Sequence, residues 1–372
     1  MPSNFPLKTL MKDQVMALES KKIRGAAIMK DAPAEDIKAM KDGNVDIIFA
    51  SPEILKGKTL DDLRLLESQI CLLVFDECHC ISEWGLDFRP EYRKVADIIS
   101  LFASCPTLLL TATATEKIQE DLYSLLALDN DTKVVAVLPD RPNVYLHVEK
   151  KVKQDIGDNL AWLLDLIKDK QELTPKTIIY CTNIYNCNSV YMWLMEELGK
   201  CAYHHEEEKL QNRFIEMFHS RTDTNTADRV LTNFKLQSNK IRVICATVAF
   251  GIGIDIPDVE YVIHWGAPVS VMTFWQETGR CGRDGRQGLC ITYPYGRSLL
   301  GSEEQLKSIL KGDICYRRKI LSMFTLKGME KGLLKTKDCE SEKCESCSCE
   351  RCCCCSICFE NCKCKGKVKS KF

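Results

Sequence analysis

The order of apolar and polar positions along the chain predicts alternating strands and helices. Several apolar runs are short and almost uninterrupted, as expected for parallel strands that are covered on both faces. The expected strands are 45–50, 70–75, 107–111, 134–137, 177–181, 241–246 and 261–264, and the clearest helical stretches are 158–169, 189–198 and 303–323. This alternation predicts an α/β fold built on parallel sheets.

Two polar stretches interrupt the pattern and are typical of a hinge: 138–143, which holds two prolines, and 150–154. After about residue 295 the pattern changes to helix and then to a tail rich in Cys, Glu and Lys. We therefore expect a first domain over residues 1–138, a second over 139–298, and a helical cysteine-rich region with a basic tail over 299–372. Two domains of ~100–200 residues and such an appendage fit within this length.

Composition and charge exclude several classes of protein. The chain is 45% hydrophobic, which excludes wholesale disorder. Its longest uncharged apolar run, 243–254, is shorter than the ~20 residues of a membrane-spanning helix, and the first 12 residues lack the apolar core of a signal peptide. We therefore expect an intracellular protein with no membrane partner. The net charge of −1 carries no global signature of a nucleic-acid binder, so such a partner would meet a local patch.

The chain has 22 cysteines in two groups. Eleven are scattered between Cys71 and Cys315, and eleven fall between Cys339 and Cys364. The scattered group, in apolar surroundings, is expected to consist of buried reduced thiols. In an intracellular chain, the dense terminal group indicates metal binding more than disulfides.

The apolar run 70–75 ends in two adjacent carboxylates, Asp76 and Glu77, followed by His79. Carboxylates at the carboxyl end of a strand face the crevice where ligands bind in open α/β sheets. There, an Asp can hold Mg²⁺ on the phosphates of a nucleotide, and a Glu can orient and deprotonate the attacking water. A solvated acidic turn is the alternative for an Asp-Glu pair taken alone.

The next segment interleaves the aromatic residues Trp84, Phe88 and Tyr92 with Arg89, a composition suited to stacking on single-stranded bases. From the Asp-Glu pair to this loop, the sequence closely resembles motif II and the aromatic-rich loop of the RecQ family of DNA helicases. Other segments resemble the family's motifs Ia, Ib, III, IV, V and VI in the same order; they are 5–15, 50–53, 111–115, 178–181, 246–255 and 276–285.

This resemblance implies two RecA-like parallel-sheet domains and a small helical zinc-binding module. It implies an ATP-dependent 3′–5′ DNA helicase that uses ATP and Mg²⁺, acts on single-stranded and forked DNA, and is nuclear if the organism is eukaryotic. The residues that it assigns to catalysis are Asp76, Glu77, His79, Gln276, Arg280 and Arg283; to ATP and Mg²⁺, Asp76, Gly253, Asp255, Arg280 and Arg283; and to DNA binding or coupling, Trp84, Phe88, Arg89, Thr111 and Thr113.

Two of these residues, Arg280 and Arg283, lie three positions apart and are flanked by glycines. Such arginines can present planar guanidinium groups to phosphates. The resemblance implies that they reach the nucleotide held by the first domain, with Arg283 as the arginine finger. A solvated basic loop is the alternative.

A helicase of this type also needs a phosphate-binding loop, G-x-x-x-x-G-K-S/T or a close variant. The family carries it upstream of motif Ia, which begins here at residue 5. The stretch 57–59, Gly-Lys-Thr, has Pro52 where the first glycine is required, and it is expected to form a surface turn. We therefore expect an N-terminally incomplete product, rather than a degenerate relative. Its first domain would lack a central strand and be poorly stable, and the chain would have little ATPase activity.

The segment 203–208, Tyr-His-His-Glu-Glu-Glu, departs from the family pattern. It replaces a His-Ala-Gly-like segment that approaches the DNA backbone. Its three adjacent carboxylates would repel phosphates, so DNA contact at this point is in doubt.

The family's zinc module uses one cysteine on a helix and a later C-x-x-C-x-x-C segment. Cys315, Cys352, Cys355 and Cys358 match this pattern, and four thiolates in a tetrahedron suit a structural Zn²⁺. The gap after Cys315 is longer than the family norm, and other close pairs leave a shifted ligand set, or no defined site, open. These pairs are Cys344 with Cys347, Cys349 with Cys352, and Cys362 with Cys364.

Two other functions are consistent with the sequence. A non-enzymatic nucleic-acid-binding protein would use the second domain, the zinc module and the basic tail, and would ignore ATP. A metal-storage tail on an inert body would hold well above one equivalent of zinc.

Overall fold

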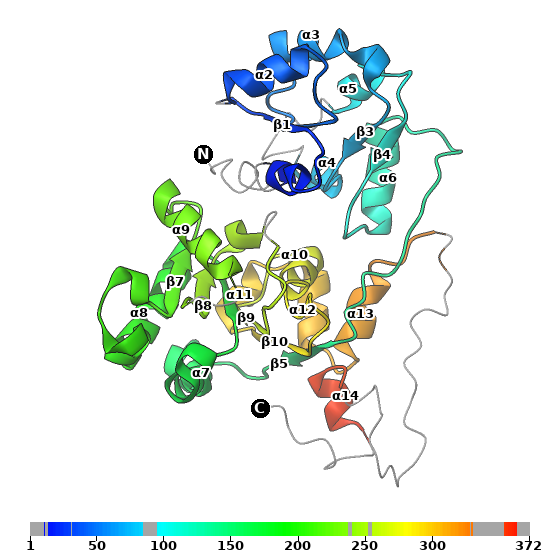
Figure 1. The fold of residues 1–372 in the computed structure, drawn as a ribbon. Helices are drawn as coiled ribbons and strands as arrows, with labels where there is room; N and C mark the ends of the chain where they lie inside the picture. The colour runs from blue at the N-terminus through cyan, green and yellow to red at the C-terminus, as the bar shows by residue number, and fades with distance from the viewer. Residues whose placement is uncertain are drawn as a thin grey trace. The chain divides into compact units, whose positions relative to one another are not determined.

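The computed structural model describes residues 11, 14–30, 32–84, 95–236, 240–251, 255–327, 329 and 353–362. The chain divides into two compact units, and it passes from one to the other between Pro139 and Asp140 (Figure 1). The first unit also includes Phe324–Met329, and the second also includes the described residues 353–362. The predicted hinge 138–143 contains this boundary, whereas 150–154 lies inside the second unit.

The first unit contains two parallel strand pairs, β1 with β2 and β3 with β4. Leu73 and Phe75 of β3 pack against a core that includes Ile28 and Phe102. The elements are β1 (Gly25–Ile28), α2 (Ala34–Lys41), β2 (Ile47–Ala50), α3 (Lys58–Arg64), β3 (Leu73–Phe75), α4 (His79–Trp84), α5 (Val95–Leu101), β4 (Thr107–Leu109) and α6 (Glu116–Leu125).

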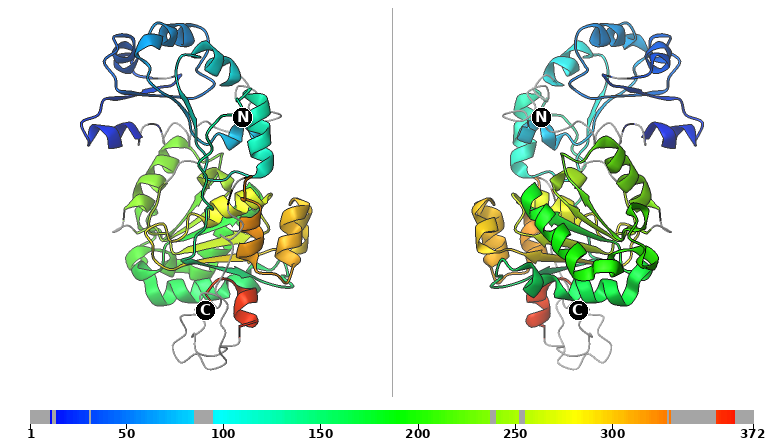
Figure 2. Two further views of the ribbon diagram at one scale, coloured as in Figure 1. Left: turned by 90° about the vertical axis from the view of Figure 1, so that its right-hand side faces the viewer. Right: turned by 90° about the vertical axis from the view of Figure 1, so that its left-hand side faces the viewer.

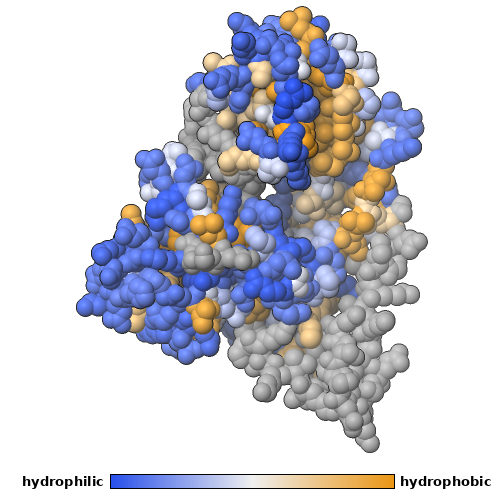
Figure 3. Space-filling model, viewed as in Figure 1, coloured by the Kyte–Doolittle hydropathy of each residue, from blue (hydrophilic) through white to orange (hydrophobic). Residues whose placement is uncertain are grey.

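One face of the β3–β4 pair is apolar and exposed. Val74 pairs in register with Leu108, and the two side chains are 49% and 41% exposed. Leu72 and Leu110 are exposed at the ends of the same strands. Figure 3 shows hydrophobic residues at the surface where β3 and β4 lie in Figure 1. Because strand side chains alternate, this face is the reverse of the one that Leu73 and Phe75 bury.

The second unit is built on a six-stranded parallel sheet with the order β5-β10-β9-β6-β8-β7. Helices α7 and α8 cover one face with a continuous apolar core, and α10 covers the other, where Phe274 packs on His264 (Figure 2). The elements are β5 (Val144–Val148), α7 (Ile156–Lys170), β6 (Thr177–Cys181), α8 (Ile184–Leu198), β7 (Ile215–Phe218), α9 (Thr224–Lys235), β8 (Val243–Ala246), β9 (Tyr261–Trp265), α10 (Val271–Thr278), β10 (Gly288–Tyr293), α11 (Gly296–Leu300), α12 (Glu304–Lys311), α13 (Tyr316–Ser322) and α14 (Ser356–Glu360).

Five helices begin at polar caps that the sequence supplies. In each case the cap side chain accepts a backbone N–H of the first turn, which would otherwise lack a partner. These caps are Thr115 before α6, Asp155 before α7, Asn183 before α8, Asp223 before α9 and Ser270 before α10. These cap residues therefore define where the five helices begin.

The α/β class and most predicted strands are confirmed, and 177–181 matches β6 at both ends. The predicted strand 134–137 is wrong: these residues form no strand, and Val135 is 96% exposed. The predicted helical stretch 303–323 is two helices, α12 and α13, with Gly312 ending the first. Strands β1, β5, β7 and β10 were not predicted, because they are short or carry a polar residue within the run.

Most of the scattered cysteines are buried free thiols, as predicted. Cys71 is exposed and Cys201 and Cys315 are only partly buried, which corrects the prediction for these three. None of the described helices combines the length and the apolar character that crossing a bilayer requires.

Candidate functional site

The two predicted acids follow β3 in a tight turn. Glu77 adopts a left-handed backbone conformation with φ 49°, and its N–H donates to Asp76 Oδ1 at 2.9 Å. The N–H of Cys78 donates to the Leu110 carbonyl beyond β4. Both carboxylates are exposed at the carboxyl end of β3, where a hydrated cation can reach them.

A partly buried hydrogen-bond network joins this turn to the loop after β4. His79 Nδ1 lies 3.0 Å from Thr111 Oγ1, and that hydroxyl donates to the Thr113 carbonyl and accepts the Thr113 N–H, both at 3.2 Å. Because the hydroxyl already uses its proton, His79 Nδ1 is the donor to it. The sequence-predicted residues His79, Thr111 and Thr113 are therefore brought together.

The surroundings of His79 fix its charge state. Burial lowers the pKa of His79 to about 4, since the nearby Asp76 only partly offsets the cost of charging a buried ring. Burial also raises the pKa of the Cys78 thiol to about 11, helped by the charge of Glu77. Near neutral pH the acids therefore stand beside a neutral imidazole and a neutral thiol.

The predicted aromatic-rich loop is mostly outside the described residues. Trp84 is the last residue of α4, and its side chain is not among those described; Phe88, Arg89 and the predicted nucleotide residue Gly253 also lie outside. Helix α4 is tied to α6 by the hydroxyl of Ser82, which donates to Asp121 Oδ2 at 2.5 Å. The start of the loop is thus anchored to the element that follows Thr113.

In the second unit, two predicted residues pair with each other. Arg283 Nη1 donates to Asp255 Oδ1 at 2.6 Å, and Arg283 Nε donates to the Gly279 carbonyl at 3.3 Å. The Asp255 side chain is 81% exposed and that of Arg283 is 29% exposed. The segments that resemble motifs V and VI therefore meet at a solvent-accessible guanidinium.

The loop between α10 and β10 depends on a glycine with a left-handed backbone. Gly282 has φ 60°, and a Cβ there would lie 2.6 Å from Asn143 Nδ2 and 2.7 Å from the Arg286 carbonyl. The Asn143 amide donates to the carbonyls of Gly282 and Arg286. Asn143 thereby holds the loop that carries both arginines close to the start of β5.

Sequence reasoning missed a third arginine, Arg141. Its Nη2 donates to the Gly279 carbonyl at 2.8 Å, and burial together with the charge of Arg283 lowers its pKa. Arg280, half-buried, lies on the same loop. Arg141 fell in a stretch interpreted as a hinge, and the contact spans 138 residues of sequence, so no local signal could find it.

Helix α10 is anchored by a buried polar group beneath it. His264 Nε2 lies 3.2 Å from Glu277 Oε2, and both side chains are almost wholly buried. Burial disfavours the charged ring, but Cys290 and Glu277 outweigh it and raise the pKa of His264 to about 10. The predicted residue Gln276 is half-buried on the same helix.

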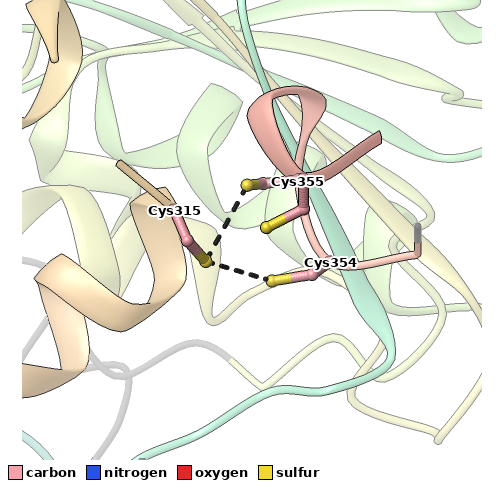
Figure 4. Close-up of side chains that lie close together, drawn as sticks. Cys315, Cys354 and Cys355 are labelled. Atoms are coloured by element: carbon pink, nitrogen blue, oxygen red, sulfur yellow. Dashed lines mark hydrogen bonds between the residues drawn. The ribbon is translucent and has the colours of Figure 1, made fainter. Parts of the chain in front are cut away.

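Four cysteines of the second unit form a cluster: Cys315, Cys354, Cys355 and Cys358. Figure 4 shows the first three. Their sulfur atoms all lie within 4.8 Å of one another. Cys315 Sγ is 3.5 Å from Cys354 Sγ and 4.0 Å from Cys355 Sγ. Sequence reasoning did not select Cys354, and the residue that it selected, Cys352, lies outside the described residues.

The sulfur spacing fits a tetrahedral metal. A Zn–S bond of ~2.3 Å requires sulfurs ~3.8 Å apart in a tetrahedron, close to the two separations above. Hydrogen bonds from the three neighbouring thiols lower the pKa of Cys315 well below its ordinary range. The close thiol contacts of the cluster thus favour a thiolate, the form that a metal requires.

The cysteine cluster is held against the sheet by backbone and ion-pair contacts. The N–H of Leu146 in β5 donates to the Cys354 carbonyl at 3.2 Å. The adjacent Arg317, which is 5% exposed, donates to Asp140 Oδ1 at 2.7 Å and to the carbonyls of Arg141 and Val144. The cluster therefore joins α13 and α14 to the edge strand of the second unit.

The Gly-Lys-Thr stretch 57–59 is not wholly the turn that the sequence predicts. Gly57 caps α3 with φ 52°, and the helix begins at Lys58. Gly57 and Lys58 are exposed.

Comparison with known proteins identifies both halves of the chain. A family model described as DEAD/DEAH box helicase matches residues 4–121, and one described as helicase conserved C-terminal domain matches residues 158–285. The ATP-dependent helicase SGS1 of Saccharomyces cerevisiae is 32% identical over 77% of the chain. The bifunctional 3′-5′ exonuclease/ATP-dependent helicase WRN of Mus musculus is 33% identical over 88% of it. The probable ATP-dependent DNA helicase RecS of Bacillus subtilis is 33% identical over 77%. The chain belongs to the RecQ family of helicases.

This RecQ-family chain spans 19% of the SGS1 sequence, 24% of WRN and 54% of RecS. Solved structures that resemble it include Saccharomyces cerevisiae Dbp5 bound to RNA and ADP BeF3, with a TM-score of 0.57 and 18% identity over 85% of this chain and 74% of that one. Mycobacterium smegmatis helicase Lhr bound to ssDNA and AMP-PNP has a TM-score of 0.55 and 18% identity over 79% and 38%. These similarities confirm the fold of two RecA-like helicase domains.

The first prediction concerns the RecQ-family residue His79. Its folded-state pKa near 4 lies below the ordinary value, so the unfolded chain gains a proton that the folded chain lacks as the pH falls. Stability that is present above pH ~6.5 should therefore be lost toward pH 4, by about 2 kcal/mol at pH 5. In His79→Gln, whose amide can still donate to Thr111, this component should disappear.

Hydrogen exchange, measured peptide by peptide at pH 7 and pH 5 and corrected for intrinsic rates, reports the first unit alone. His205→Asn, which removes an exposed histidine of the second unit, is the control and should behave as the wild type does there. An equal loss of protection in the wild type and His79→Gln would contradict the assignment.

Proposed function

We propose that this chain is the motor core of a RecQ-type ATP-dependent DNA helicase. It couples ATP hydrolysis to 3′–5′ movement along single-stranded DNA and to unwinding of the duplex. The observation that carries the proposal is the exposed Asp76–Glu77 pair after β3, joined through His79 to Thr111. The chain that holds it is 32–33% identical to ATP-dependent helicases over most of its length.

In this proposal the two carboxylates of the first unit bind the metal ion and activate the attacking water. Asp76 would hold Mg²⁺, which neutralises charge on the triphosphate. Glu77, whose side chain is 51% exposed, orients the attacking water and accepts its proton. Asp76 fixes this turn by accepting the Glu77 N–H.

The arginines of the second unit stabilise the charge that develops on the transferred phosphoryl group. Arg283 is the arginine finger, and Arg280 acts beside it. Asp255 accepts a hydrogen bond from Arg283 Nη1 at 2.6 Å, and phosphate oxygens would compete for the same donor. Gln276 and Gly253 belong to the same nucleotide site in this proposal, and Arg141 adds positive charge behind Arg283.

The network from His79 to Thr113 couples hydrolysis to DNA. A shift of the Glu77 turn would move Thr111, because the imidazole bridges the two loops. Trp84, Phe88 and Arg89 contact single-stranded and forked DNA in this proposal. A nuclear location, for a eukaryotic source, is part of it too.

The cysteine cluster is a structural zinc site in this proposal. Cys315, Cys354, Cys355 and Cys358 supply four thiolates at a spacing that fits Zn²⁺. The ion would fasten α13 and α14 to β5, beside the buried Arg317.

The second prediction tests the enzyme directly. The sequence contains no G-x-x-x-x-G-K-S/T segment, so residues 1–372 by themselves should hydrolyse ATP only slowly with or without DNA. A chimera with a strand, a G-x-x-x-x-G-K-S/T loop and a helix fused ahead of residue 5 should show DNA-stimulated ATP hydrolysis. In the chimera, Arg283→Ala should lower kcat by about 10³-fold or more. Glu77→Gln should lower it by at least about 10²-fold.

Arg286→Ala is the matched control, because Arg286 is an exposed arginine of the same loop that pairs with Asp284; its kcat should stay near that of the parent chimera. A folded chimera that never hydrolyses ATP would contradict the proposal. DNA binding that weakens with salt and ignores ATP would then favour a non-enzymatic nucleic-acid-binding protein. Rapid ATP hydrolysis by residues 1–372 alone would show that the added phosphate-binding loop is not required.

The third prediction concerns zinc. After dialysis against a competing chelator, the chain should retain one equivalent of zinc by elemental analysis. Cys354→Ser and Cys358→Ser should lose it because each removes a thiolate of the cluster. Cys352→Ser and Cys201→Ser should keep it. Loss in Cys352→Ser with retention in Cys354→Ser would assign the ligands to Cys315, Cys352, Cys355 and Cys358 instead, and retention of several equivalents would favour a metal-storage tail.

A further inference from the structure

We propose that Glu172, His204 and His205 form a second metal site, for a divalent cation of the zinc, cobalt or nickel class. The site lies in the second unit and does not depend on the proposed helicase function. Its two histidines belong to the segment 203–208, where the sequence departs from the family pattern. The cysteine cluster uses none of these residues.

The three side chains come from two loops that meet. Glu172 lies in η3 (Gln171–Leu173), which follows α7, and the histidines lie in η5 (His204–Glu206), which follows α8 and η4 (Gly199–Ala202). One ligand atom from each residue lies within 4.8 Å of the others, and His204 Nδ1 is 2.7 Å from Glu172 Oε1. Zinc bonds of ~2.0–2.2 Å place such atoms ~3.4 Å apart, so rotations of the exposed Glu172 and His205 complete the site.

The surroundings of the His204 ring support a ligand role. Nδ1 is buried, yet among the described residues it has no hydrogen-bond partner of normal geometry, although Glu172 Oε1 is so close. His264 Nε2 beside Glu277 is misaligned in the same way, so the misalignment alone does not indicate a ligand. What distinguishes His204 is a second imidazole: among the described residues, a nitrogen of His205 lies within 4.8 Å of both His204 and Glu172.

The backbone and the core keep the two rings together. His205 and Glu206 adopt left-handed conformations with φ 55° and 54°, which are uncommon for residues other than glycine. This turn brings the rings of His204 and His205 together, tilted by 49° with their centroids 4.0 Å apart. His204 also packs edge-on against the buried Phe214 at 6.0 Å, so one ligand is fixed in place.

The local charge favours a cation. Glu206 and Glu208 are exposed beside the rings, while Glu207 is engaged by Lys209 at 2.9 Å and by Asn212 at 3.1 Å. The ammonium of Lys240 donates to the neutral Asn212 Oδ1 at 2.8 Å, so its positive charge remains near His204 and opposes that of an ion, but Glu206 and Glu208 outnumber it. Two imidazoles and one carboxylate are ligands that zinc, cobalt and nickel prefer, and they leave a fourth position for water.

A bound ion would act as a clamp between the loops after α7 and α8. A His–Glu ion pair without a third ligand offers no such clamp, and the second unit contains one for comparison. His147 Nε2 of β5 lies 3.1 Å from Glu149 Oε2 just after the strand, and among the described residues this pair belongs to no group of three metal-ligand side chains. It is therefore the matched control.

The fourth prediction concerns cobalt binding to the full chain. The cysteine cluster is first filled with zinc, and excess metal is removed. Co²⁺ is then titrated in, and its binding is measured by calorimetry and by visible absorption. We expect one further equivalent, with weak d–d bands and without the intense thiolate-to-cobalt charge-transfer band of a cysteine site. Glu172→Gln and His205→Asn should weaken this equivalent by at least about tenfold. Asn is chosen because it tolerates the left-handed backbone.

His147→Asn and Glu149→Gln should bind the further equivalent as the wild type does. Circular dichroism should show that all four variants fold, because each changes a partly or fully exposed side chain. The proposal is overturned if no further equivalent binds, if it shows thiolate charge transfer, or if Glu172→Gln and His205→Asn bind it as tightly as the controls. If no further equivalent binds, or if the variants bind it as tightly as the controls, Glu172 and His204 form an ordinary ion pair.

Discussion

Parallel strand pairing is the constraint on which the rest of this structure depends. In the first unit, Phe75 pairs with Leu109, so the loops after β3 and β4 emerge at the same edge. That common edge is what allows His79 to reach Thr111 and leaves Asp76 and Glu77 in solvent. The chemistry of the first unit follows from the direction and register of two short strands.

The second unit uses the same constraint for a different purpose. Parallel pairing places Tyr180, His264 and Thr292 in one row across β6, β9 and β10. His264 in this row meets Glu277, so α10 is fixed over the sheet and returns the chain to where β9 and β10 begin. Its loop is fastened there, because the Gly282 N–H donates to the Val259 carbonyl at 2.8 Å.

Features formed by residues adjacent in sequence, such as apolar strands and short motifs, could be predicted from the sequence. The uninterrupted apolar run 177–181 is a strand because both of its faces are buried, whereas 134–137 is equally apolar but has no neighbouring strand to pair with. Strands β5 and β10 were missed because His147 and Thr292 interrupt their runs. The acids, His79 and the Arg283 loop were found through motifs whose residues are adjacent in sequence.

What could not be predicted depends on distant contacts. Arg141 joins the arginine loop across 138 residues, and Cys354 enters the cluster because its carbonyl pairs with β5. A regular C-x-x-C spacing favours Cys352 over Cys354, whereas the structure has an extended backbone at Cys355, just before α14, and places Cys354 Sγ 3.5 Å from Cys315 Sγ. Likewise, Glu172 and the two histidines are brought together by loops that no local pattern connects.

The central claim is that the acids of one unit and the arginines of the other serve a single phosphoryl-transfer step. A double-mutant cycle tests it most directly: kcat for DNA-stimulated ATP hydrolysis is measured in the active chimera for Glu77→Gln, Arg283→Ala and the combined variant. Groups that act in one step are strongly non-additive, so the combined variant should be little slower than the slower single variant. Losses that simply multiply, or an Arg283→Ala variant as fast as its parent, would contradict the claim.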